Sequence, residues 1–297
     1  MILAIGSINL DLVARVERLP GPGETVAGGE FATLPGGKGA NQAVAAALAG
    51  AKVRMIGAIG NDAFADGALP FLISSGVDIA DIRRLASPTG VALILVDAAG
   101  ENAIAVVPGA NGLLTPEHAR QCGIAKSDIV LLQQEIPLAS VAAALDAAKD
   151  AGATSILNTA PFRDDFAGLA DKADYLVANE TEFDLICAAL DIAGEDRKAR
   201  MLAFAARTGN RVIVTLGAGG AVAAVEGRIV WAAPLKIEPV DTVGAGDTFC
   251  GYFAAGLASG LTAEAALRRA TIAASLACLK PGAQSAIPRA HEVDLAL

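Results

Sequence analysis

Short apolar segments alternate with helical patterns along most of the chain, and this alternation limits the possible folds more than any other feature. Val53–Ile59 is typical of a strand and Ala63–Ser75 of a helix, and Ile129–Leu132 and Leu138–Ala151 repeat the pair. Parallel strands need long crossover connections, which are usually helices. The sequence therefore predicts an α/β fold of three layers (α/β/α), in which helices cover both faces of a mostly parallel central sheet.

The other segments of this kind follow the same scheme. Apolar strands are expected at Ile2–Gly6, Ser155–Leu157, Tyr175–Val177 and Arg211–Leu216, a closing hairpin at Gly220–Val225 and Arg228–Ala232, and helices at Ala40–Ala49, Asp247–Leu257 and Ala263–Leu279.

Four half-exposed extended segments do not fit this scheme. They alternate polar and apolar residues, which is typical of a strand with one solvent-exposed face. The four segments are Asn9–Leu19, Glu24–Leu34, Gly90–Val96 and Asn102–Val107. Since no linker or repeat divides the chain, we expect one domain over residues 1–297, with a small β lid formed from about 9–34 and 90–107.

Composition excludes several classes of protein. The formal charge of −9 and the aromatic content of 4% argue against binding nucleic acid. The longest uncharged run, Thr248–Ala263, has 16 residues, fewer than the roughly 20 that a spanning helix needs. The N-terminus has no basic region typical of a signal peptide, and the four cysteines are far apart in the sequence. We therefore expect a cytoplasmic protein with reduced thiols and no membrane partner.

The segment Val240–Gly251, VDTVGAGDTFCG, predicts an anion site. Gly244 and Gly246 allow a turn that opens a helix, so that free amide N–H groups and the positive end of the helix dipole face one small volume. Such a volume suits a phosphate group. Asp247 lies in the first helical turn. It is either a residue favoured there by the dipole, or a base that takes a hydroxyl proton while the amides hold a phosphoryl group.

Polar side chains follow several of the expected strands. Asn9 and Asp11 follow the first strand, and Gln134–Glu135, Asn179–Glu182 and Thr215–Gly220 follow three later ones. Ligands of open α/β sheets bind outside the carboxyl ends of the strands. We therefore expect these groups to converge on one site.

Each motif also has a plain structural interpretation. Pro35–Gln42, PGGKGANQ, opens a helix with glycines that could let a ligand press on the backbone, or it is a turn with a solvated lysine. Asn9 and Asp11 lie on one strand face and suit vicinal hydroxyls, or they belong to a solvated edge.

Three further motifs also have both a functional and a structural interpretation. Asn179–Glu182, NETE, could orient water around Mg²⁺ or simply begin a helix. Thr215–Gly220, TLGAGG, could lie along a nucleotide phosphate or lead into a hairpin. Asp241 could bind a monovalent cation with backbone carbonyls, or accept backbone N–H bonds in the turn.

Together these motifs resemble the PfkB-type sugar kinases. GGKGANQAVAAA (Gly36–Ala47), NETE, TLGAGG and DTVGAGDTFCG (Asp241–Gly251) occur in that family's order, and PGETV, TGVALI and KPGAQ extend the similarity over almost the whole chain. The resemblance implies the ribokinase-like fold and an ATP-dependent phosphotransferase that uses Mg²⁺ and a K⁺-type activator. The motifs are most similar to those of the kinases of D-ribose, which implies phosphorylation at O5. The resemblance also implies a homodimer in which the lids of two copies pair with each other.

The resemblance also implies a role for individual residues. Asp247 would be the catalytic base, and the amides of Gly244, Ala245 and Gly246 would hold the γ-phosphoryl group. The sugar would be bound by Asn9, Asp11, Gly37, Lys38, Asn41 and Glu135. ATP would be bound by Asn179, Thr215, Leu216, Gly217, Ala218, Gly219, Gly220 and Gly246, with Thr271 near adenine. Glu182 would act on Mg²⁺ through water, and the monovalent cation would lie among Asp241, Val243, Ala277, Lys280 and Gly282.

Two positions differ from the pattern of related sequences. Ala286 stands where related sequences often carry a hydroxyl residue beside the cation, and Thr271 falls only near the usual adenine contact. A sister kinase acting on a nucleoside or another sugar, and a sensor without catalysis, are the alternative functions. An NAD-dependent oxidoreductase is disfavoured because no GxGxxG follows the first strand.

Overall fold

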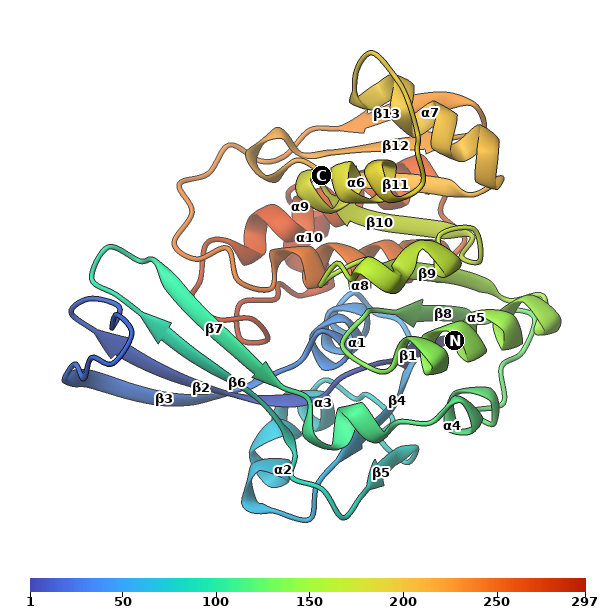
Figure 1. Cartoon of the computed structure of the whole chain (residues 1–297). Helices are drawn as coiled ribbons and strands as arrows, with labels where there is room; N and C mark the ends of the chain where they lie inside the picture. The colour runs from blue at the N-terminus through green and yellow to red at the C-terminus, as the bar shows by residue number, and fades with distance from the viewer.

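The computed structural model describes the backbone of residues 1–297 and every side chain apart from those at 164, 166 and 167. It contains two sheets, one of nine strands and one of four (Figure 1). The large sheet runs in the order β13 (Arg228–Ala232), β12 (Ala221–Val225), β11 (Arg211–Thr215), β10 (Tyr175–Asn179), β9 (Thr154–Asn158), β8 (Ile129–Leu132), β1 (Ile2–Ile5), β4 (Val53–Ile59) and β5 (Ile82–Arg84). All neighbouring pairs are parallel except β11–β12 and β12–β13, which are antiparallel.

Helices cover both faces of the large sheet and create two hydrophobic cores. One core packs the sheet against α1 (Lys38–Leu48), α2 (Ala63–Ala68), α3 (Pro70–Ser74), α8 (Ala245–Ala258), α9 (Ala263–Ala277) and α10 (Ala290–Asp294). The other packs it against α4 (Pro116–Arg120), α5 (Leu138–Ala151), α6 (Glu180–Ala189) and α7 (Arg197–Thr208). The central strands are apolar on both faces because both are covered. In the part of the chain that the structure describes, no helix is long and apolar enough to span a bilayer.

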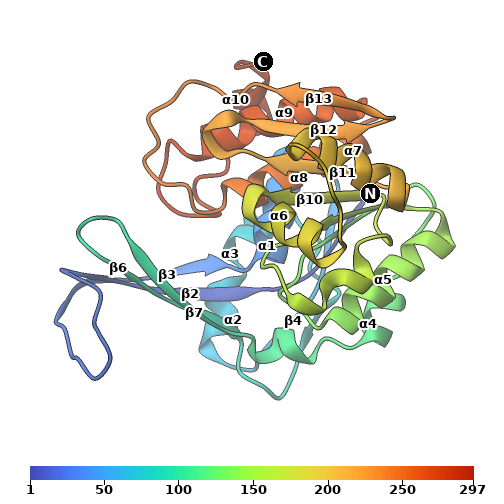
Figure 2. The same ribbon diagram turned by 45° about the horizontal axis from the view of Figure 1, so that its top comes forward.

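The small sheet extends away from the three-layer body in both views (Figures 1 and 2). Its order is β3 (Gly28–Gly36), β2 (Asn9–Val16), β6 (Gly90–Val96) and β7 (Asn102–Val107). The two outer pairs are antiparallel and the central pair, β2–β6, is parallel. At its base Asn9 is the register partner of both Gly36 and Gly90, so three connections to the body lie side by side.

The predicted fold class is confirmed, and several elements have the predicted bounds, namely β4, β6, β7, β8 and α5. The helix predicted over Ala63–Ser75 is wrong as one element, because Pro70 has no amide N–H and begins a second helix after Leu69. The strands predicted at 9–19 and 24–34 are also displaced. Glu24 accepts hydrogen bonds from Arg18 and from the amide of Gly21, which closes a turn where strand was expected.

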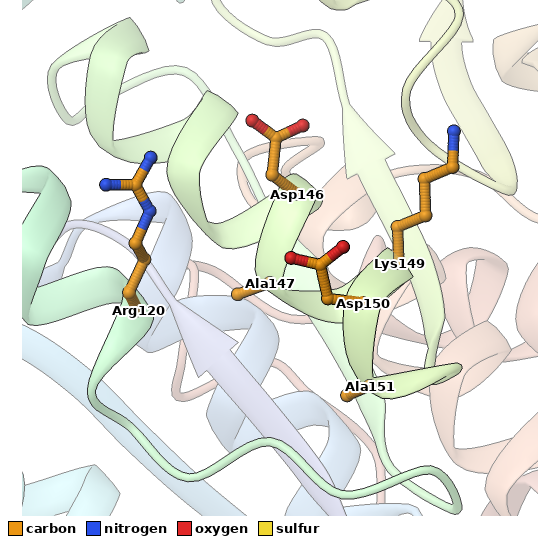
Figure 3. Close-up of a pocket in the computed structure, with 6 residues that line it drawn as sticks. All are labelled: Arg120, Asp146, Ala147, Lys149, Asp150 and Ala151. Carbon is orange, nitrogen blue, oxygen red and sulfur yellow. The ribbon is translucent and has the colours of Figure 1, made fainter.

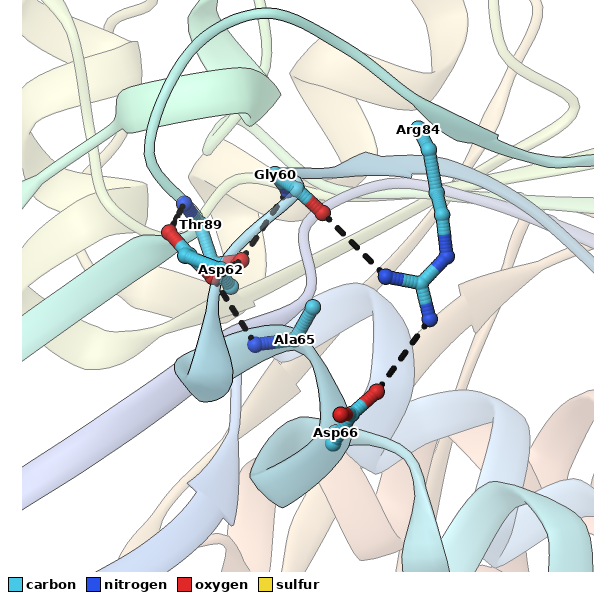
Figure 4. Close-up of polar contacts among 6 residues, drawn as sticks. All are labelled: Gly60, Asp62, Ala65, Asp66, Arg84 and Thr89. Atoms are coloured by element: carbon cyan, nitrogen blue, oxygen red, sulfur yellow. Dashed lines mark hydrogen bonds and ion pairs between the residues drawn. The ribbon is translucent and has the colours of Figure 1, made fainter.

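A cluster around Asp62 ties the small sheet to the large one (Figure 4). Asp62 Oδ2 accepts the amide of Thr89 at 2.7 Å, and Oδ1 accepts the Thr89 hydroxyl at 2.6 Å and the amide of Ala65 at 3.0 Å. Thr89 Oγ1 in turn accepts the amide of Gly60, at the end of β4. Burial alone would raise the pKa of Asp62, but these hydrogen bonds outweigh it and lower the pKa. The start of β6 is therefore fixed to the end of β4.

Close contact between α1 and α8 depends on a glycine. A Cβ at Gly251 would lie 2.5 Å from the Cβ of Ala45 and 2.6 Å from the carbonyl oxygen of Gln42. Both of these atoms belong to a well-packed helix, so neither can move away cheaply. Gly251 therefore sets the distance between the two helices that carry the candidate site.

We expect Gly251→Ala to lower the free energy of unfolding by about 1–3 kcal/mol, because the added methyl group overpacks the α1–α8 contact. Urea unfolding followed by circular dichroism measures this change. Gly28→Ala is the control, since a Cβ there would lie on the exposed small sheet, 3.6 Å from the Arg15 carbonyl oxygen, which is an ordinary van der Waals distance. Equal losses in the two variants would contradict the close packing.

Candidate active site

The carboxyl ends of β1 and β8 meet at the start of α1. The hydroxyl of Ser7, which follows β1, donates a hydrogen bond to Glu135 Oε2 at 2.5 Å. The backbone amide of Lys38 donates to the same oxygen at 3.0 Å. Glu135 follows β8. One carboxylate therefore joins three segments that are far apart in the sequence, as expected for the switch region of an open α/β sheet.

Asp247 lies buried in the first turn of α8, and both its carboxylate oxygens accept hydrogen bonds from α1. Asn41 Nδ2 donates to Oδ2 and Gln42 Nε2 donates to Oδ1, each at 2.9 Å. Gly244, at φ 75°, precedes the helix in the left-handed region. A Cβ at Gly246 would meet no heavy atom within 4 Å, so this part of the turn faces open space beside Asp247. The arrangement leaves room for an anion at the helix N-terminus.

Four buried amide side chains extend this network, and no sequence pattern pointed to a role for them. Gln133 Nε2 donates to Gln42 Oε1 at 2.7 Å, and Gln284 Nε2 donates to Asn41 Oδ1 at 2.9 Å. Gln42 Nε2 also reaches Asn158 Oδ1 at 3.1 Å. A signal did exist for two of them, since Gln42 directly follows Asn41 in the glycine-rich motif and Gln133 directly follows β8.

Asp11 and Lys38 belong to the same charged group as Glu135 and Asp247. Burial, followed by the charges of Glu135 and Asp247, raises the pKa of Asp11 to about 7, against the opposing effect of Lys38. The Asp247 carboxylate raises the pKa of Lys38, with a smaller contribution of the same sign from Glu135. Asp11, Lys38, Glu135 and Asp247 therefore lie close enough together to interact electrostatically.

The neighbouring residues at the base of the small sheet are tightly held. Asn9 Oδ1 accepts Asn111 Nδ2 at 2.8 Å, and Asn111 also bonds both the amide and the carbonyl of Ile8. Gly37, at φ 87°, approaches the amide of Asn9 so closely that a Cβ would lie 2.7 Å from it. These contacts fix the backbone on which Asn9 and Asp11 lie.

Asn179 and Thr215 are register partners at the ends of β10 and β11. Asn179 caps α6, and Glu182 completes a capping box by accepting the amide of Asn179 at 3.0 Å. Glu182 Oε2 also accepts the hydroxyl of Thr159 at 3.2 Å. The structural interpretation of NETE as a helix start therefore holds, and one oxygen of Glu182, Oε1, has no hydrogen bond among those observed.

The TLGAGG segment forms a short 3₁₀ turn, η3 (Gly217–Gly219), directly after β11. Trp231 Nε1 donates to the carbonyl of Gly219 at 3.0 Å and so supports the turn from β13. Thr271 is not brought to this surface, because it is 3% exposed and its hydroxyl donates to the carbonyl of Leu267.

Asp241 joins the two segments of the expected cation site, 241–243 and 277–282. Its Oδ1 accepts the amide of Val243 at 2.9 Å and its Oδ2 accepts the amide of Gly282 at 2.8 Å. Lys280 contacts Ala277 through a long backbone bond of 3.4 Å. The described residues include no cluster of three or more His, Cys, Asp or Glu side chains that could hold a metal.

A separate hollow lies away from these residues, between the end of α4 and the C-terminal half of α5 (Figure 3). Arg120 lines one side of it and Asp146, Lys149 and Asp150 line the other. Asp146 is already paired with Lys172 at 2.5 Å. None of the residues that converge at the strand ends takes part, so we do not assign the chemistry to this hollow.

The chain is similar to known carbohydrate kinases over almost its whole length. The model of the pfkB family of carbohydrate kinases matches residues 1–290. The chain belongs to this family. It is 40% identical to the ribokinase of Bacillus subtilis (strain 168) over 295 residues, which are 99% of this chain and 98% of the relative.

Solved structures of PfkB-family kinases superpose closely on this member of the family. The crystal structure of ribokinase from Thermotoga maritima has a TM-score of 0.90 and 34% identity, and covers 99% of this chain and 98% of its own. The structure of Arabidopsis thaliana ribokinase complexed with ribose and ATP has a TM-score of 0.87 and 32% identity, with 99% and 97% coverage.

The raised pKa of Asp11 gives a prediction for stability. Its folded pKa of about 7 lies above the ordinary value of 3.8, so ionising it costs folding free energy; that cost grows as pH rises from about 4 to about 7 and stays constant above. We expect Asp11→Asn to raise Tm by a few degrees at pH 8 and to leave it unchanged at pH 4.

Thermal unfolding at the two pH values measures this difference. Asp150→Asn, at an exposed position on α5, is the control and should shift Tm equally at both. A pH-independent Tm difference for Asp11→Asn would show that Asp11 ionises normally in the folded protein.

Proposed function

We propose that this PfkB-family kinase transfers the γ-phosphoryl group of ATP to O5 of D-ribose, giving ribose 5-phosphate and ADP. One observation carries the proposal: Asp247 is buried in the first turn of α8, held through both oxygens, next to a glycine turn that faces open space. A base beside a helix N-terminus is what transfer of a phosphoryl group to an alcohol requires. The similarity to ribokinases supports ribose as the acceptor.

The proposed reaction is a direct in-line transfer. Asp247 takes the proton of the O5 hydroxyl as the new O5–P bond forms. The bond between the γ-phosphorus and the β,γ-bridging oxygen breaks, and ADP leaves with that electron pair. The amides of Gly244, Ala245 and Gly246 would hold the phosphoryl oxygens while charge shifts to the leaving group. No covalent enzyme intermediate is needed.

The sugar would be bound where the small sheet joins the body. The proposed contacts come from the strand ends and the start of α1, and they are Asn9, Asp11, Gly37, Lys38, Asn41 and Glu135. A carboxyl group with a pKa near 7 suits sugar hydroxyls, because each hydroxyl both donates and accepts. Asn41 has one amide hydrogen beyond its bond to Asp247, so it is able to contact the sugar as well.

ATP would lie along the ends of β10 and β11. The proposed contacts are Asn179, Thr215, Leu216, Gly217, Ala218, Gly219, Gly220 and Gly246. We leave Thr271 out of this set because its side chain is buried and bonded to its own helix. Glu182 fits a role toward the waters of an ATP-bound Mg²⁺, since one of its oxygens remains available. When bound, Mg²⁺ would neutralise charge on the phosphates.

A monovalent cation would be held by oxygen atoms of Asp241, Val243, Ala277, Lys280 and Gly282. The donor set fits a hard cation, because it consists of a carboxylate and backbone carbonyls. Asp241 already joins the two segments through the amides of Val243 and Gly282. The cation would add positive charge beside the glycine turn.

An ATP-consumption assay over a panel of acceptors tests the proposal. We expect turnover with D-ribose in the presence of Mg²⁺, well above that with 2-deoxy-D-ribose, hexoses or nucleosides, and faster in K⁺ than in Na⁺. Turnover with a nucleoside alone would refute ribose and leave the phosphoryl-transfer site intact. ATP binding without turnover on any acceptor would favour a sensor.

Asp247→Asn is the matched variant for this assay. It should lower kcat by about 10³-fold while the protein remains folded and binds ribose, because only the proton acceptor is lost. A kcat close to that of the wild type would exclude Asp247 as the base.

We further propose that the small sheet covers the sugar and pairs with a second copy of the chain. The face of the sheet that carries Asp11 continues outward as an apolar patch, since the strand register places Leu34 opposite Asp11 and Ile104 opposite Ile94 on that face. Ile104 is 53% exposed. Exposed apolar surface of this kind is typical of a protein interface.

Ile104→Lys should therefore convert a dimer into a monomer, because a charge in the patch would have to be desolvated on pairing. Analytical ultracentrifugation measures the change in mass. Leu295→Lys, at an exposed position near the C-terminus and outside the small sheet, is the control and should remain dimeric. A wild-type protein that sediments as a monomer would refute the pairing.

A further inference from the structure

Two chains of amide side chains converge on Asp247, and its charge fixes their direction. An ionised carboxylate only accepts hydrogen bonds, so Gln42 must turn its NH₂ group toward Asp247. Gln42 Oε1 then points the other way and accepts Gln133 Nε2. The same reasoning orients Asn41, whose Oδ1 accepts Gln284 Nε2.

Gln42 cannot reach a substrate from its position. Gln42 and Gln133 are both 0% exposed. Gln42 lies on α1 at the contact with α8, where its carbonyl oxygen would lie 2.6 Å from a Cβ at Gly251. Any effect of Gln42 on a reaction must therefore pass through the residues it bonds, Asp247 and Asn158.

The orientation of Gln42 is set by three partners at once. Its NH₂ group serves two oxygens, on Asp247 and Asn158, and its Oε1 accepts from Gln133. A Gln42 amide flipped by 180° would place Oε1 against both oxygens and its NH₂ group against the Gln133 donor. Gln133 thus disfavours the flipped state without touching Asp247.

We propose that Gln42, held in one orientation by Gln133, is a positioning residue for the base Asp247. The inference rests on the proposed function, in which Asp247 takes a hydroxyl proton. With Oδ1 tied to Gln42 and Oδ2 tied to Asn41, the carboxylate has one rotamer and presents fixed lone pairs to the acceptor hydroxyl. Preorganisation of this kind accelerates the chemical step more than it tightens substrate binding.

The test replaces Gln42 and Gln133 by methionine, which has a similar length and no amide. We expect Gln42→Met to lower kcat by about 100-fold while the KM values for sugar and ATP change by less than about 3-fold. Gln133→Met should lower kcat by a smaller factor, about 3- to 10-fold, because Gln42 Oε1 loses its donor while Gln42 Nε2 keeps its bonds to Asp247 and Asn158, so the side chain is held less firmly. The double variant Gln42→Met/Gln133→Met should have the same kcat as Gln42→Met alone, because Gln133 acts on Asp247 only through Gln42.

Ser155 offers a control in which a buried hydrogen bond is lost without any contact to Gln42 or Asp247. It is 2% exposed, lies near the start of β9, and its hydroxyl donates to Asp174 Oδ2 at 2.9 Å. Ser155→Ala should keep kcat within about 3-fold of the wild type. Circular dichroism and thermal unfolding of all variants check that they remain folded.

The outcomes separate this inference from the proposed function. If the wild type phosphorylates a sugar and Asp247→Asn does not, an unchanged kcat in Gln42→Met overturns the inference alone. A rise in KM with unchanged kcat, or equal losses of kcat in Ser155→Ala and Gln42→Met, overturns it as well.

If the wild type turns over no acceptor, the proposed function fails. The relay of hydrogen bonds from Gln133 through Gln42 to Asp247 is then tested without substrate. Urea unfolding of Gln133→Met, Asp247→Asn and the double variant then measures whether these two residues, which do not touch, are coupled. Additive changes in the free energy of unfolding would overturn the relay.

Discussion

The buried carboxylate of Asp247 is the interaction on which the rest of the site depends. A charge can remain in a packed interior only when hydrogen bonds replace its hydration. Asn41 and Gln42 supply them, and both lie on α1, so the charge requires α1 and α8 to stay in one relative position. Gly251 permits the short distance between these helices. The geometry of the proposed site and the packing of the core around α1 and α8 therefore depend on the same helix pair.

The layered fold could be predicted from the sequence because its signals are local. Apolar runs such as Val53–Ile59 and Ile129–Leu132 have no polar alternation, and a strand buried on both faces needs none. The strand–helix spacing then implies parallel pairing. Errors arose where a single residue changed the backbone locally, as at Pro70, or where side chains closed a turn, as Arg18 and Glu24 do.

The site was only partly predictable, for a different reason. Asp247 and the glycine turn are visible as a helix start, and Asn41 is visible in a glycine-rich motif. That Asn41 bonds Asp247 is a contact between residues 206 positions apart, and no local pattern encodes it. Glutamine is ordinarily a surface residue, so the positions of Gln42 after a glycine-rich motif and of Gln133 after a strand do not reveal that they are buried and bonded to each other. Gln284, which bonds Asn41, gives no sequence signal at all.

The way the small sheet joins the body has a consequence for the divergence of such proteins. Asn9, Gly36 and Gly90 form one row at its base, and the Asp62–Thr89 cluster holds that row against β4. Rotation of the sheet about this row would displace the far ends of the strands by a large distance and the base by very little. Ile94 and Ile104 of the apolar patch lie farther from this row than Asp11 does. Substitutions in the outer strands can therefore change the proposed pairing with a second copy while the geometry of the proposed sugar contacts at the base stays constant.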